Sequence, residues 1–298
     1  MSNPKKPWRE SIIDINNVKF KKIKLDKVIS YPPAGNDVFE CIGEYNNQNM
    51  TFIIKSERGK FANFENEIKV LKSFEKKLPV PSILESGTNE KLVYIVLSKI
   101  QGKKLSEISK YTKDLKPYLF EYGRTLSKIH NMDLIWEKAR QRDINDFPDK
   151  TQYKNLTSWE NKIIDYPKET KPLKIKMNTF IHGDFHYGNI LWKNKKITGI
   201  LDWEYAGTGF KEQDIAWALV LRPTQNFLKT KEEISIFLEG YKKIGTYDVF
   251  KLKWCLINGY MHFYLMNREK NDTIYLKNLK KLIELFMKND IENINALN

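Results

Sequence analysis

The sequence of 298 residues predicts an α+β fold with two lobes. Up to about residue 100, apolar residues alternate with polar ones or form short β-branched runs, which is typical of strands. From Glu212 onward, apolar residues recur every three or four positions, which is typical of helices. The pattern changes near residues 98–102. We therefore expect a small β-rich lobe over residues 1–100 and a larger, mostly helical lobe over residues 101–298.

The first lobe is expected to hold an antiparallel sheet and one helix. The run Asn46-Asn47-Gln48-Asn49 predicts a hairpin turn, because Asn tolerates the left-handed backbone region. Phe64, Ile68 and Leu71 follow helical spacing within the expected helix over 61–76. The strands are expected over 24–31, 38–45, 50–56 and 91–97.

The second lobe is expected to be mainly helical, with a short strand over 197–201. Tyr122, Leu126 and Ile129 share one face of its first helix. The helices are expected over 118–130, near 155–165, and over 212–221, 227–244, 248–268 and 274–289.

Composition excludes several classes of protein. The net charge of +14 comes mostly from Lys spread along the whole chain, without an Arg-rich arm or zinc-finger spacing, so no nucleic-acid partner is expected. No apolar run reaches the ~18–20 residues of a membrane helix, and no signal peptide is recognisable, so we expect no membrane association and a cytoplasmic location. Cys41 and Cys255 are expected to be reduced thiols.

The most informative stretch is TFIHGDFHYGNILW, residues 179–192. Its polar cluster is too dense for an ordinary turn. In phosphoryl transfer, an Asp accepts the proton of the attacking hydroxyl, while an Asn on the same loop and an Asp at a strand end hold Mg²⁺. Asp184 and Asn189 have that spacing, and Asp202 follows the apolar strand ITGIL.

The residues between Asn189 and Asp202 predict a hairpin of two short strands with a turn at 193–196. That hairpin would bring Asn189 and Asp202 side by side at its open end. A plain hairpin with a polar entry loop would explain the glycines, but not why His182 and Asp184 gather there as well.

A phosphate-binding Lys on a strand and a Glu on the next helix are also expected at such a site. Lys55 follows the apolar strand TFII, and Glu67 lies twelve residues later on the expected helix. Glu65 is about 200° around that helix from Glu67, so only one of the two can face the lysine. We choose Glu67 because it shares a face with Leu71.

A loop that covers the nucleotide phosphates should lie between the first two strands, where the sequence reads SYPPAGNDVFEC. Gly35 and Asn36 can adopt positive φ there. No GxGxxG pattern is present, so a plain turn stiffened by Pro32 and Pro33 explains this stretch equally well.

These motifs resemble the aminoglycoside phosphotransferase and choline kinase superfamily, which shares the protein-kinase-like fold. The resemblance covers roughly residues 25–270 and is most specific over 182–189 and over ILDWEYAGTGFKEQDIAWAL, residues 200–219. It implies that Asp202 binds the metal and that Asp214 braces the catalytic loop. It also implies that a hinge at about Ser98 to Ile100 binds the nucleotide base through backbone groups.

The sequence departs from the family pattern at Tyr187, where many members have Pro, and in the Gly-poor loop over 32–37. Only eleven residues separate Asp202 from Asp214, without an A-P-E motif, so no protein substrate is expected.

The expected activity is therefore Mg²⁺-dependent transfer of a γ-phosphoryl group from ATP or GTP to a hydroxyl of a small molecule. Lys55 would steady the nucleotide phosphates, and Glu67 would orient Lys55. Asn189 and Asp202 would hold the metal, and Asp184 would take the acceptor proton. His182 is expected to donate a hydrogen bond within the loop, and His130 is expected to be structural.

The acceptor is expected to be an aminoglycoside-type antibiotic, with choline, another amino alcohol or another metabolite as the alternative. A catalytically silent kinase-like binding protein is the third possibility. The positive net charge favours a neutral or anionic acceptor, although a local acidic cleft could override it. Four aromatic residues could form a cation-binding cage or belong to the core: Trp203, Trp217, Tyr260 and Tyr264.

Overall fold

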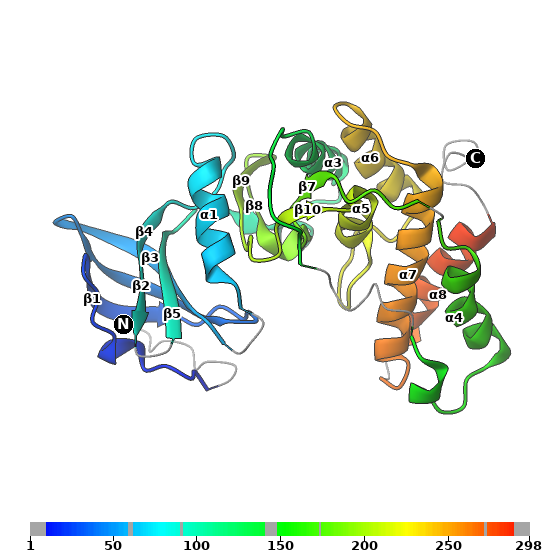
Figure 1. Ribbon diagram of the computed structural model, residues 1–298, viewed down its shortest axis with the longest axis horizontal. Helices are drawn as coiled ribbons and strands as arrows, with labels where there is room; N and C mark the ends of the chain where they lie inside the picture. Colours follow the sequence, from blue (N-terminus) through cyan, green and yellow to red (C-terminus); the bar gives the residue numbers. More distant parts are fainter. Residues whose placement is uncertain are drawn as a thin grey trace. The chain divides into compact units, whose positions relative to one another are not determined.

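The computed structural model describes residues 10–58, 62–89, 92–140, 148–172, 174–270 and 273–288. The chain divides into two compact units, coloured by sequence in Figure 1: residues 1–102 with 198–205, and residues 103–197 with 206–298. The segment 198–205 groups with the first unit because its backbone is bonded there. Ile200 N–H donates to the Pro79 carbonyl, and Thr198 Oγ1 donates to the Gln101 carbonyl.

The first unit contains a five-stranded antiparallel sheet of order β1-β2-β3-β5-β4. The predicted turn after β2 forms, with Asn46 and Asn47 at φ values of 51° and 61°. The predicted strands are confirmed within a few residues. The strands are β1 (Ile23–Ser30), β2 (Asp37–Tyr45), β3 (Gln48–Ser56), β4 (Ile83–Asn89) and β5 (Leu92–Ser98).

The strand β4 was not predicted from the sequence. Its residues ILESGTN include Gly87 and polar side chains that hide the apolar pattern. The strand is held by pairing with β5 and by Glu85, which accepts hydrogen bonds from two backbone N–H groups before β1. It is therefore stabilised by the strand that follows it directly and by backbone N–H groups 63 and 64 positions earlier in the sequence.

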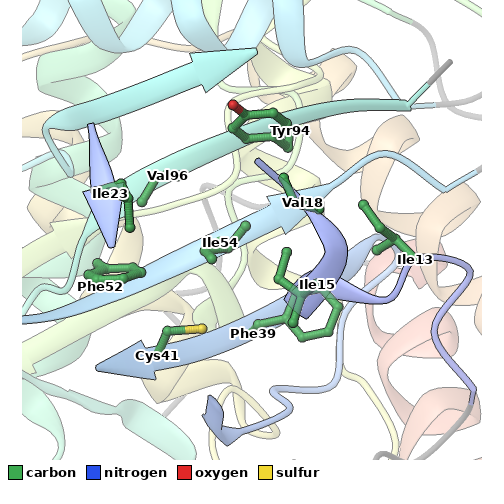
Figure 2. Packing of buried hydrophobic residues seen from close by; sticks show 10 residues of the cluster. All are labelled: Ile13, Ile15, Val18, Ile23, Phe39, Cys41, Phe52, Ile54, Tyr94 and Val96. Atoms are coloured by element: carbon green, nitrogen blue, oxygen red, sulfur yellow. The ribbon is translucent and has the colours of Figure 1, made fainter. Parts of the chain in front are cut away.

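One face of this sheet carries the apolar core of the first unit, shown in Figure 2. Alternate residues of β2 and β3 point into it, among them Phe39, Phe52 and Ile54. The segment containing Ile13 and Ile15 covers it. Because side chains alternate along a strand, Lys55 points to the opposite face.

The helix α1 (Phe64–Phe74) lies against that opposite face, where its Glu67 meets Lys55. It begins after Asn63, whose side chain accepts a hydrogen bond from the Asn66 N–H, and it is shorter at both ends than predicted. Phe64 and Phe74, the first and last residues of this helix, are fully buried.

The second unit is mainly helical, as predicted, and the α+β class of the whole chain is confirmed. Helix α6 begins later than predicted because Thr230 caps it together with Glu233. The helices are α2 (Leu105–Ile108), α3 (Lys116–His130), α4 (Ser158–Glu169), α5 (Lys211–Leu219), α6 (Lys231–Lys242), α7 (Val249–Asn267) and α8 (Thr273–Lys288).

Short strands frame the motif-bearing loops of the second unit. Strand β6 (Lys103–Lys104) pairs with β8 (Ile190–Lys193), and β7 (Thr179–Ile181) pairs antiparallel with β10 (Gly207–Gly209). The predicted turn after β8 has Asn194 and Lys195 at positive φ and leads into β9 (Lys196–Ile200). Among the helices that the structure describes, none has the length and apolar character needed to cross a membrane.

Helices α3 and α6 approach each other closely at two glycines. A Cβ on Gly123 would lie 1.9 Å from the Phe237 carbonyl oxygen, and a Cβ on Gly240 would lie 1.9 Å from that of Phe120. The absence of both side chains lets α3 deliver His130 to the interior of the unit, where it is buried.

Gly123→Ala is therefore expected to lower the free energy of unfolding by about 3 kcal/mol through overpacking against backbone atoms. Urea unfolding followed by circular dichroism measures this change. Gly35→Ala is the control, because a Cβ there meets no atom within 4 Å. Equal stability of the two variants would contradict the close approach of α3 and α6.

Candidate active site

The predicted site residues form two clusters, one in each unit. The first cluster surrounds Lys55, which lies near the end of β3. The side chain of Lys55 is only 10% exposed. Its Nζ donates to Glu67 Oε2 at 2.6 Å, to Asp202 Oδ1 at 3.1 Å and to Glu204 Oε1 at 3.1 Å. The competing Glu65 is exposed and pairs with Lys69 instead.

This cluster places one ammonium group among three carboxylates. Burial alone would lower the pKa of Lys55, but the charges of Asp202, Glu67 and Glu204 raise it well above its usual range. Burial raises the pKa of Glu204 and the Lys55 charge lowers it, while the neighbouring carboxylates raise it further, with a net pKa of about 7. The excess negative charge means that a further cation would be stabilised here.

The donor set fits a hard divalent cation. One oxygen each from Glu67, Asp202 and Glu204 lie within 4.8 Å of one another. Carboxylate oxygens are the ligands that Mg²⁺ prefers. Sequence analysis missed the position of Glu204, although it lies two residues after Asp202 in DWE, so its proximity to Lys55 could have been suspected.

The backbone around Asp202 is held in an unusual conformation. Asp202 has φ of 65°, in the left-handed region that few residues other than Gly adopt. The next residue, Trp203, is fully buried, donates from Nε1 to the Ile200 carbonyl and packs its ring 5.1 Å from that of Phe74. This anchor turns both flanking carboxylates toward Lys55.

The side chain of Asn36, in the loop over 32–37, contacts this cluster. Asn36 Nδ2 donates to Glu204 Oε1 at 2.5 Å, and its Oδ1 accepts from the Arg58 N–H. Gly35 and Asn36, which can adopt positive φ, do not do so in this turn. Sequence alone could not reveal a contact between residues 168 positions apart.

The expected hinge residues lie at the end of β5. Ser98 exchanges hydrogen bonds with Ser82, through its N–H and its Oγ. Ile100 is half-buried just beyond the strand. Their role in binding a nucleotide base stays a prediction.

The second cluster is the loop that follows β7. Asp214, in the first turn of α5, accepts from the His182 N–H at 2.9 Å and from the Gly183 N–H at 3.1 Å. Gly183 has φ of 76°, which glycine adopts without strain. The pairing of β7 with β10 brings these residues together, since β10 leads into α5.

Asp214 is in turn held by a buried chain of side chains. His130 Nε2 lies 3.1 Å from Asp214 Oδ2, and His130 Nδ1 lies 2.7 Å from the Tyr241 hydroxyl. Burial opposes ionisation of Asp214, but its bonds to His130 and the loop hold its pKa below the ordinary value. His130 is a structural histidine, as predicted, that supports the brace of the loop.

Asp184, at the centre of this loop, has both carboxylate oxygens bonded. Asn189 Nδ2 donates to Asp184 Oδ2 at 3.1 Å, and Trp217 Nε1 donates to Asp184 Oδ1 at 2.7 Å. The Asp184 N–H donates to His182 Nδ1, so the His182 ring accepts in this bond, whereas the sequence analysis expected it to donate. Asn189 belongs to the second unit and Asp202 to the first, so their expected proximity stays a prediction.

The contact from Trp217 was missed by sequence analysis, which weighed this residue for a four-member aromatic cage. Trp203 and Tyr260 are fully buried core residues, and the ring of Tyr264 packs on Trp159. The detectable signal was spacing: Trp217 lies three residues after Asp214, on the same face of α5.

Asp214→Asn is expected to lower the free energy of unfolding by about 3 kcal/mol, because an amide cannot accept all the bonds of this buried carboxylate. The folded pKa of Asp214 is depressed from its ordinary value of 3.8. Its contribution to stability is therefore present above pH 3.8 and is lost as the pH falls through the folded pKa.

Urea unfolding at several pH values tests this. The difference between wild type and Asp214→Asn should be constant near neutral pH and shrink in acid. The exposed Asp133→Asn serves as control. A difference that grows in acid would contradict the assignment.

Comparisons with known proteins identify the family and the fold of this chain. A family model described as the phosphotransferase enzyme family matches residues 34–248, most of the chain. An aminoglycoside 3'-phosphotransferase of Niallia circulans is 25% identical over 189 residues, which cover 59% of this chain and 70% of the relative. Another, of Enterococcus faecalis, is 22% identical over 221 residues, covering 68% and 81%.

Solved structures show the same fold. An aminoglycoside phosphotransferase mutant in complex with ADP and hygromycin B superposes with a TM-score of 0.61 at 13% identity, covering 89% of this chain and 94% of that chain. A spectinomycin phosphotransferase in complex with ADP and spectinomycin superposes with a TM-score of 0.58 at 16% identity, covering 91% and 93%. The resemblance inferred from the motifs is confirmed, and this chain belongs to the phosphotransferase enzyme family.

Proposed function

We propose that this phosphotransferase moves the γ-phosphoryl group of ATP or GTP to a hydroxyl of a small aminoglycoside-type acceptor. The observation that carries this proposal is the Asp184 carboxylate, which N–H donors from Asn189 and Trp217 hold at the end of a braced loop. Each carboxylate oxygen can accept more than one hydrogen bond. Asp184 can therefore still orient an acceptor hydroxyl and take its proton.

The first unit would bind the nucleotide. Lys55 would contact the phosphates, and Glu67 would keep its ammonium group in position, as their 2.6 Å ion pair supports. Asn36, which bonds Glu204, would place the loop over 32–37 beside the phosphates. Ser98 and Ile100 would offer backbone groups to the base.

Mg²⁺ would be held by Asp202 and Asn189, with Glu204 close to Asp202. The ion would neutralise charge that develops on the phosphoryl group. The Asn189 amide donates from Nδ2 to Asp184, which directs its oxygen away from that carboxylate. The amide oxygen is then the atom suited to a hard cation.

The named relatives support the aminoglycoside-type acceptor, since both are aminoglycoside 3'-phosphotransferases. Choline-like amino alcohols and other metabolites are the alternative. The complete set of Lys55, Asp184, Asn189 and Asp202 favours an active enzyme over a silent binding protein. We further propose a cytoplasmic location, where ATP and GTP are available.

Asp184→Asn is expected to reduce phosphoryl transfer by about 10²–10⁴-fold, because the amide cannot take the acceptor proton. The assay follows ATP- and GTP-dependent product formation with Mg²⁺, using aminoglycosides in one pool and choline-like alcohols and sugars in another. Asp133→Asn is the matched control, since its side chain is exposed in the same unit.

Transfer to the aminoglycoside pool that Asp184→Asn abolishes would support the proposal. Transfer confined to the other pool would favour the metabolite alternative. Nucleotide binding without transfer to either pool would contradict the proposed activity and favour a binding protein.

A further inference from the structure

Arg222, just beyond helix α5, lies on an aromatic surface of the second unit. Its guanidinium carbon is 4.6 Å from the ring centre of Trp217, 5.7 Å from that of Phe263 and 6.0 Å from that of Tyr187. These distances are those of cation–π contacts. All four side chains are half-buried, so the surface reaches solvent.

The guanidinium group is also fixed by backbone acceptors. Arg222 Nη1 donates to the Val220 carbonyl at 3.0 Å, and Nη2 donates to the Trp217 carbonyl at 3.0 Å. A side chain tied at two points and surrounded by three rings has little freedom to swing away. Its charge is permanent, because guanidinium does not lose its proton in proteins.

The same indole ring links this cation to Asp184. Trp217 presents a face to Arg222 and directs its N–H to Asp184 Oδ1. The aromatic surface therefore borders the carboxylate to which the proposed function assigns the acceptor hydroxyl. Aromatic rings at such a place would ordinarily attract an ammonium group of an acceptor.

We infer that the Arg222 guanidinium fills the cation position of these aromatic rings. It thereby selects acceptors that carry no ammonium group next to the reacting hydroxyl. The favoured chemistry at that position is an uncharged or anionic alcohol, such as an unaminated sugar ring. This inference rests on the proposed function, which makes Asp184 the acceptor-side base. Within the aminoglycoside-type class it favours acceptors whose reacting ring has no amino group, because an ammonium group beside the reacting hydroxyl, as in choline, would meet a fixed positive charge there.

Two effects disfavour an acceptor ammonium group at this position. An acceptor ammonium would have to displace Arg222 from the rings or share them with a like charge, and partly buried charges are screened less by salt than exposed ones. The field of Arg222 already acts on its neighbours. Burial raises the pKa of the Tyr187 hydroxyl, and the positive charge of Arg222 opposes that rise.

The test compares two acceptors of equal shape on the full-length chain by calorimetry: choline, and its uncharged isostere in which a tert-butyl group replaces the trimethylammonium group. Arg222→Ala removes the guanidinium group and leaves the ring faces accessible to a ligand cation. It should raise the affinity for choline, relative to the isostere, by about tenfold or more, the size expected of a desolvated cation–π contact. Arg222→Lys keeps a positive charge beside the rings and should leave the affinity ratio within about twofold of wild type, because a Lys ammonium also binds aromatic faces.

Arg222→Gln guards against local unfolding, because its amide can still donate to a backbone carbonyl without the charge. It should shift the ratio in the same direction as Arg222→Ala, while the melting temperature and ADP affinity stay close to wild type. An unchanged ratio, or no gain of choline binding in either neutral variant, would overturn the inference.

These outcomes are separable from failure of the proposed function. Transfer to hydroxyl acceptors combined with an unchanged affinity ratio would leave the activity and remove the role of Arg222. A shifted affinity ratio in a protein that transfers phosphate to no acceptor would support the role of Arg222 and contradict the proposed activity.

Discussion

In the first unit, one buried lysine lies among three carboxylates, and much of the local structure serves that arrangement. Partners of opposite charge must lie close together when they are removed from water, since a buried charge without a partner is strongly destabilising. Helix α1 has to present Glu67 to Lys55, and Asp202 adopts a left-handed backbone conformation beside the buried Trp203. The excess of negative charge makes this cluster suited to a cation and its phosphate ligands.

In the second unit, hydrogen bonds rather than ion pairs with lysine stabilise a buried carboxylate. Asp214 is buried, and its oxygens receive two backbone N–H groups of the loop as well as His130. Those bonds fix the start of the loop, and Asp184 is then held by Trp217 from the same helix. One short helix thus braces the loop, holds the Asp184 carboxylate and leads to Arg222, so the proposed base and the proposed acceptor-selecting residue are supported by the same element.

The sequence predicted the features that depend on spacing within one segment. The period of the apolar residues located most strands and helices, and helical geometry favoured Glu67 over Glu65. Contacts between distant segments were not predictable, because nothing local links Asn36 to Glu204. Strand β4 was missed for a different reason, since Gly87 and its polar side chains obscure the apolar pattern of a strand.

The most direct test of the metal–nucleotide site is a calorimetric titration with a non-hydrolysable ATP analogue, with and without Mg²⁺. In wild type, Mg²⁺ should strengthen binding by about tenfold or more, as expected when an ion neutralises phosphates beside carboxylates. Asp202→Asn should lose that enhancement, while the exposed Asp26→Asn should keep it. An affinity independent of Mg²⁺ in wild type, or an enhancement retained in Asp202→Asn, would contradict the assignment of this cluster as the metal–nucleotide site.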